Sequence, residues 1–110
     1  MALSCADPAA VEDFYTRHFG YRRARVIQAG DVEVIFLKSG DAYLELFAAE
    51  GPSSDATPTE DGHHFPGVRH LAFKVDDVDA KLAEMGDDAK ITLGPLDFSE
   101  VIPGWRTVWV

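Results

Sequence analysis

Hydrophobic residues recur along the chain with two different periods, and each change of period marks a predicted element. After a short apolar strand at residues 1–5, one face of a helix is marked at spacings of three and four residues by Val11, Phe14, Tyr15 and His18. Asp7 before Pro8 favours a helix start, and Gly20 favours a stop. The pattern predicts a helix at about residues 8–19.

A meander of three strands is predicted next. Residues 21–28, 32–38 and 42–49 are rich in β-branched and alternating apolar residues, and glycine-containing turn sequences separate them. Strand side chains alternate between the two faces of a sheet. In the third strand Tyr43, Glu45 and Phe47 therefore share one face, while Leu44 and Leu46 share the other.

Residues 50–66 are rich in Pro, Ser, Thr, Asp and Gly without an apolar period, which indicates a long loop. Beyond it we expect strands at residues 67–75, 90–93 and 105–110. Between the first two, a helix capped by Asp76 or Asp77 carries Val78, Leu82 and Met85 on one face and ends at Gly86. The expected organisation is one domain over residues 1–110, with unit one at 1–49 and unit two at 67–110.

The two halves repeat one pattern. A constant shift of 70 positions lays LSCADPAAV, from Leu3, over FKVDDVDAK, from Phe73, and pairs Asp7 with Asp77. A unit of this kind buries one sheet face under its helix. Two such units side by side would therefore leave two sheets curved around a shared cleft, on the side away from the helices.

Composition and charge narrow the classes of partner. Nineteen acidic and ten basic residues give a net charge of −9, which repels phosphate backbones and anionic lipids, so we expect no nucleic acid or membrane partner. No apolar run approaches the roughly 20 residues of a membrane helix. The single Cys5 cannot form an intramolecular disulfide, and the first residues lack the pattern of a signal peptide. A cytoplasmic protein is therefore expected.

Three segments resemble the vicinal oxygen chelate superfamily of glyoxalases, bleomycin-resistance proteins and extradiol dioxygenases. They are the capped helix ending in FYTRHFGY, the strand YLELF, and GVRHLAFKVDD after the loop. The resemblance implies an α+β fold of two βαβββ units that form a curved mixed sheet around a cleft, with the second unit lacking its last strand in this chain. In metal-dependent members, the first and fourth strands of each unit supply the ligands of one divalent ion.

Two metal ligands follow from the resemblance. Glu45 matches the fourth-strand ligand of the first unit, and His70 matches the first-strand ligand of the second. A carboxylate and an imidazole suit Zn, Ni, Co, Mn or Fe(II). The other two ligand positions fall outside residues 1–110, so either the chain is trimmed at both ends or it departs naturally from the family. The hydrophobic strand sequence at 105–110 favours trimming, because it would leave an unpaired edge.

Other side chains have a structural and a functional interpretation side by side. Glu45 alone fits a solvent-facing strand surface, and His70 alone fits a hydrogen-bonded core histidine. His63 and His64 fit a solvated loop or a lid, whereas His18 and Cys5 are expected to pack against the core. The basic patch of Arg22, Arg23 and Arg25 either meets an anion or pairs with nearby acids.

The function implied by the resemblance is that of a lyase, isomerase or dioxygenase. A divalent metal would chelate vicinal oxygens of a small substrate and stabilise an enolate-type intermediate. Tyr43 and Phe47 are predicted to bind that substrate because they share the face of Glu45, and no general base is assigned. The alternative is a metal-free small-molecule-binding protein of the bleomycin-resistance type. A docking module with an exposed apolar patch is a third possibility, and a homodimer is expected.

Overall fold

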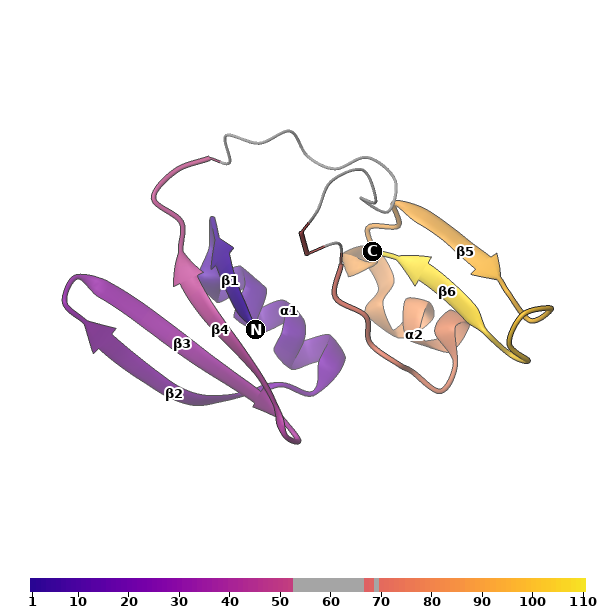
Figure 1. The fold of residues 1–110 in the computed structure, drawn as a ribbon, viewed down its shortest axis with the longest axis horizontal. Helices are drawn as coiled ribbons and strands as arrows, with labels where there is room; N and C mark the ends of the chain where they lie inside the picture. The colour runs from indigo at the N-terminus through magenta and orange to yellow at the C-terminus, as the bar shows by residue number, and fades with distance from the viewer. Residues whose placement is uncertain (53–66, 69) are drawn as a thin grey trace. The chain divides into compact units, whose positions relative to one another are not determined.

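The structure is a computed structural model that describes residues 1–52, 67, 68 and 70–110 (Figure 1). The chain forms two compact units, Met1–Ser54 and Asp55–Val110, and each is described by itself below. Both combine helix with sheet, which confirms the α+β class predicted from the sequence.

Unit one has the order strand, helix, strand, strand, strand. Its elements are β1 (Ala2–Cys5), α1 (Pro8–Phe19), β2 (Arg22–Ala29), β3 (Val32–Ser39) and β4 (Ala42–Ala48). The sheet order is β1-β4-β3-β2, with β1 parallel to β4 and the other pairs antiparallel. The predicted helix and meander are confirmed, and the βαβββ order of unit one with them.

Helix α1 begins and ends where its capping residues require. The Asp7 carboxylate accepts hydrogen bonds from the backbone amides of Ala9 and Ala10 at 3.0 and 3.1 Å, which satisfies two amides that have no partner inside the helix. At the other end Gly20 adopts a left-handed conformation with φ 68°, which L side chains rarely adopt.

The core of unit one lies between α1 and one face of the sheet. Leu37 of β3 and Leu46 of β4 are completely buried there, and Arg23, opposite Leu37 in the ladder, reaches Glu12 of α1. Cys5 and His18 are buried as well, as expected. Burying a leucine side chain contributes roughly 1.5–3 kcal/mol, so this layer of leucines fixes which face of β4 points away from the helix.

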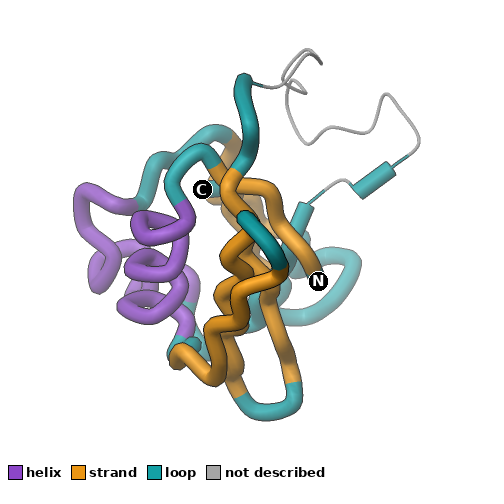
Figure 2. Tube along the Cα trace, turned by 90° about the vertical axis from the view of Figure 1, so that its left-hand side faces the viewer, coloured by secondary structure: helices purple, strands orange, loops and turns teal. Residues whose placement is uncertain are grey.

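Unit two contains α2 (Val78–Met85), the short 3-10 turn η1 (Gly86–Asp88), and the antiparallel pair β5 (Leu93–Asp97) and β6 (Arg106–Trp109). Figure 2 colours the helices and strands of both units. The Asp77 carboxylate accepts a hydrogen bond from the Ala80 amide at 2.9 Å, Met85 is buried, and Gly86 follows the helix. The second predicted helix is therefore confirmed, with Asp77 as its cap.

The strand predicted at residues 90–93 is wrong. The observed strand begins at Leu93 and runs through Gly94 and Pro95 to Asp97, with an irregular register between Leu93 and Leu96. Proline has no amide to donate, so it is tolerated where a bulge interrupts the ladder. Gly94 and Pro95 therefore lie inside this strand.

The strand predicted at residues 67–75 is not formed over its described residues. Residues 70–75 keep the alternation of a strand: Leu71, Phe73 and Val75 are half-buried, while His70, Ala72 and Lys74 are exposed. In unit one the equivalent strand β1 is held by β4. In the described part of unit two, only β5 and β6 pair, so the segment has no neighbouring ladder to join.

Candidate functional site

Glu45 lies on the face of the four-stranded sheet that points away from α1, called the open face from here on. The register places Glu45 beside Ala2 of β1 and beside Phe36 of β3. Tyr43 and Phe47 precede and follow Glu45 by two residues on the same face, while Leu44 and Leu46 are buried on the other. The structure therefore brings together three of the four residues singled out from the sequence.

The Glu45 carboxylate is half-buried and has no hydrogen-bond or ion-pair partner within the part of the chain that the structure describes. Its backbone is held firmly, because the Glu45 amide donates to the Met1 carbonyl at 2.8 Å. The Met1 ammonium donates to the Tyr43 carbonyl at 2.9 Å. A partly desolvated carboxylate gains from a nearby cation, so the chemistry of Glu45 fits one donor of a divalent metal.

The three arginines of β2 differ in the groups that they contact. Arg23 forms a two-pronged ion pair with Glu12 of α1, with its Nε 2.7 Å from Oε1, and this hydrogen bonding lowers the pKa of Glu12. Arg22 donates to the carbonyls of Thr16 and Tyr21 at 3.4 and 3.2 Å. The pairing expected from the acidic composition is thus seen for Arg23.

A shift of register between Arg23 and Arg25 moves Arg25 to the open face, opposite Phe36. Arg25 is exposed and has no acidic partner among the described residues. Lys38 lies on the same face, opposite Tyr43, with its ammonium 5.3 Å from the centre of the Tyr43 ring. The sequence did not indicate that these two cations share a face with Glu45. The bulge before Arg25 is invisible in an alternating pattern, and the position of Lys38 opposite Tyr43 depends on how β3 pairs with β4.

His70 belongs to unit two. Its side chain is exposed, and its ring stands nearly perpendicular to that of Trp109, with centroids 6.0 Å apart. The convergence of His70 with Glu45 stays a prediction. His63 and His64 lie outside the described residues. Trp109 is the neighbour that the sequence did not reveal, since the two residues are far apart along the chain and no motif links them.

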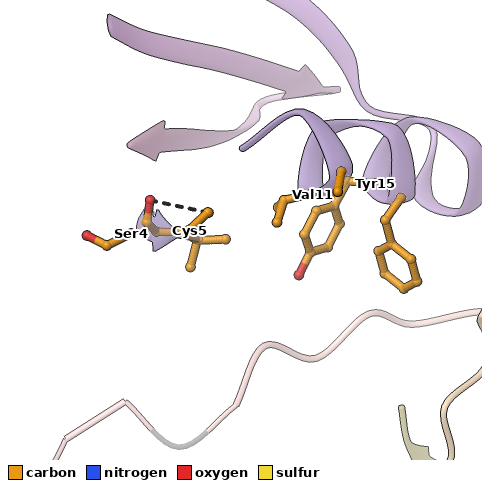
Figure 3. A pocket seen from close by; sticks show the side chains of 7 residues that line it. Ser4, Cys5, Val11 and Tyr15 are labelled. Atoms are coloured by element: carbon orange, nitrogen blue, oxygen red, sulfur yellow. Dashed lines mark hydrogen bonds between the residues drawn. The ribbon is translucent and has the colours of Figure 1, made fainter. Parts of the chain in front are cut away.

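A hollow of about 460 Å³ lies between β1 and α1 in unit one (Figure 3). Leu3, Val11, Phe14 and Tyr15 line it together with Cys5, whose thiol donates to the Leu3 carbonyl at 3.7 Å. Burial raises the pKa of both Cys5 and Tyr15. The hollow is apolar and lies on the helix side of the sheet, so it is separate from the open face.

A second hollow, of about 680 Å³, lies in unit two between residues 72–79 and 102–107. Its lining includes the charged residues Lys74, Asp76, Asp77, Asp79 and Arg106. Arg106 donates to Asp79 at 2.9 Å and carries a buried Nε without a partner among the described residues. Neither Glu45 nor His70 lines either hollow.

Among the described residues, no group of three or more His, Cys, Asp or Glu side chains gathers where it could hold a metal ion. A stable protein site generally has three or four protein donors. Glu45 therefore fits a metal as a single donor, and the described residues of its own unit do not complete a site.

The sequence model of the Glyoxalase/Bleomycin resistance protein/Dioxygenase superfamily matches residues 1–97. The chain belongs to this superfamily. Members of the superfamily commonly bind divalent metals and small molecules, and often form dimers. The membership agrees with the βαβββ order of unit one and with the α+β class of the whole chain.

The fold is also similar to that in the crystal structure of SMU.1112c, with a TM-score of 0.56 and 31% sequence identity. The match covers 77% of this chain and 68% of that one. Comparison with curated proteins found no match. Within the described residues, neither helix has the length and apolar character needed to span a membrane.

Proposed function

We propose that this superfamily member uses a divalent metal to act on a small substrate with two neighbouring oxygens, and that Glu45 and His70 are two of the metal ligands. One observation carries the proposal: the half-buried Glu45 carboxylate on the open face has no cationic partner within the described residues. An ion there would offset the cost of desolvating that charge.

Each residue of the proposed site has a separate task. The Met1 carbonyl and the pairing of β4 with β3 hold the backbone of Glu45, so its carboxylate is positioned before any ligand binds. Tyr43 and Phe47 present their side chains on either side of Glu45 and exclude water from a bound substrate. When bound, the metal supplies a Lewis acid that chelates two substrate oxygens and stabilises negative charge on them.

His70 supplies an imidazole from unit two. It is exposed and therefore accessible to a ligand, and its perpendicular contact with the Trp109 ring restricts its orientation. Two protein donors are too few for a stable site, so we assign the further donors to residues outside the described part or to a second copy of the chain. In the second case the active form is a homodimer, which we place in the cytoplasm, where Cys5 stays reduced.

A second candidate is a metal-free binding protein that sequesters a small planar compound. The observation that favours it is the shortage of donors, because the described residues gather no set of three. Phe36, Tyr43 and Phe47 would then form the binding surface, and Glu45 would accept a hydrogen bond from the ligand.

The metal content of protein purified without chelator separates the two candidates. The enzyme proposal expects about one equivalent of Zn, Ni, Co, Mn or Fe per chain in the wild type. Glu45→Gln and His70→Ala are expected to lose most of it, whereas Glu33→Gln, an exposed glutamate of β3, should retain it. Trace metal that is equal in all four proteins would overturn the metal proposal and leave the binding protein.

A further inference from the structure

We infer that the ligand of the open face is a planar anion, whose ring lies against Phe36, Tyr43 and Phe47 and whose negative group is held by Arg25 and Lys38. The inference rests on the proposed function in placing the ligand at this face. It goes further in naming the class of compound and the residues that select it.

The strand register fixes the layout of this surface. One row across the sheet runs Ala2, Glu45, Phe36, Arg25, and the next row runs Tyr43, Lys38, Arg22. The guanidinium of Arg22 donates to the carbonyls of Thr16 and Tyr21. Neighbouring strands lie about 4.8 Å apart, so Arg25 is roughly 10 Å from Glu45 across the sheet. Diagonal neighbours on one face are about 7–8 Å apart, which places Arg25 and Lys38 within reach of one carboxylate.

Four of the nine basic residues in the described part have an acidic partner, and five have none, namely Arg22, Arg25, Lys38, Lys74 and Lys90. Arg17, Arg23, Lys81 and Arg106 each form an ion pair with an aspartate or glutamate. Arg25 and Lys38 have no acidic partner within the described residues, although the chain carries nineteen acidic residues against ten basic ones. The strands of the open face contribute one carboxylate, that of Glu45, and the rows place Phe36 between it and Arg25.

The chemistry of the surface then selects the ligand. A neutral ligand that covered Arg25 and Lys38 would strip water from two cations without replacing it. A carboxylate compensates both cations for the lost water. The arginine guanidinium binds it through two parallel hydrogen bonds, and the lysine ammonium attracts it as a point charge. The aromatic side chains near these charges offer apolar surface for a flat ring, and the buried Val34 lies on the same face, opposite Phe47.

The test compares 3,4-dihydroxybenzoate with its methyl ester. Both have a ring and two neighbouring oxygens, but only the acid has a negative group at the far end. Dissociation constants are measured by calorimetry under anaerobic conditions, with and without added Zn(II), at low salt. The variants are Arg25→Gln and Lys38→Gln, with Arg17→Gln on α1 as a control that removes the same charge from an exposed side chain outside the open face.

We expect the wild type and Arg17→Gln to bind the acid about fivefold more tightly than the ester, which is the size of effect typical of a charge interaction at an exposed surface. The preference should shrink toward unity in Arg25→Gln and Lys38→Gln and should weaken with added salt. Binding of the ester should change little in either variant, which shows that the surface itself is intact.

Equal affinity for acid and ester, a preference that survives both substitutions, or no binding of either compound would overturn the inference. If the metal proposal fails, the same binding measurements give a different result. In that case added Zn(II) and Glu45→Gln leave the affinity for both compounds unchanged, while the preference for the acid and its dependence on Arg25 and Lys38 remain.

Discussion

Asp7 and Asp77, 70 positions apart, begin the two helices with the same interaction. Asp7 accepts hydrogen bonds from the amides of Ala9 and Ala10, and Asp77 accepts one from the amide of Ala80. Both caps have extended backbone conformations. The repeat of the sequence is thus also a repeat of local structure, and the two caps allow the two units to be perturbed separately.

Replacing either cap should destabilise its own unit. Asp7→Ala removes the acceptor for two amides, and Asp77→Ala removes the acceptor for one, so each is expected to cost about 1 kcal/mol of unfolding free energy. Urea denaturation followed by circular dichroism measures the effect. Asp7→Asn, which keeps the acceptor oxygen, should cost much less than Asp7→Ala, and equal losses in both would contradict the capping role.

The ion pair of Glu12 with Arg23 makes stability depend on pH. Its hydrogen bonds lower the pKa of Glu12 in the folded state, below an unfolded value of about 4.3. The stabilisation is therefore complete above the unfolded value and is lost as the pH falls through the folded one. Wild type should exceed Glu12→Gln in unfolding free energy at pH 7, and the gap should shrink as the pH falls through the lowered pKa of Glu12. A gap that stays constant would show that the charge of Glu12 is not involved.

Leu46 should be among the most sensitive positions of unit one. It is completely buried between β4 and α1, and Leu46→Ala is expected to cost about 2–5 kcal/mol, because a cavity remains that the surroundings fill only in part. Val32, which is 47% exposed, serves as a comparison, and Val32→Ala should cost less than about 1 kcal/mol. Thermal unfolding of both variants measures the difference. Similar losses would contradict the placement of the core.

Cys5 should react slowly with thiol reagents in the native protein. It is 7% exposed, and burial raises the pKa of its thiol, which lowers the fraction of reactive thiolate. We expect the reaction with Ellman's reagent at pH 8 to be about a hundredfold slower than in urea, where the chain is unfolded. Comparable rates in the two conditions would place Cys5 outside the core.

Local patterns predicted the helices, their caps and the two faces of β4, because spacing, capping chemistry and alternation depend on neighbours in sequence. The errors arose where pairing with distant strands decides the outcome. Residues 70–75 alternate like a strand but join no ladder within the described part of the chain, and β5 continues through Gly94 and Pro95 beside a bulge. Arg25 faces the same way as Glu45 because of another bulge, in β2.

The candidate site could be predicted only in part, because some of its contacts also join residues that are distant in sequence. Alternation placed Tyr43 and Phe47 with Glu45, whereas the cations on that face and the contact of His70 with Trp109 depend on residues that are distant in sequence. The pairing of Glu45 with His70 rests on family resemblance and not on a local pattern.

The most direct test of the central claim is a titration of Mn(II) into nitrogen-15-labelled protein, followed by NMR. Bound Mn(II) broadens signals near it, so one shared ion is expected to broaden the amides around Glu45 and those around His70 together, at the same metal concentration. Glu45→Gln should abolish both effects, and Glu33→Gln should abolish neither. Broadening around one of the two residues alone, or only at exposed acidic residues such as Asp87, would contradict a metal site shared by Glu45 and His70.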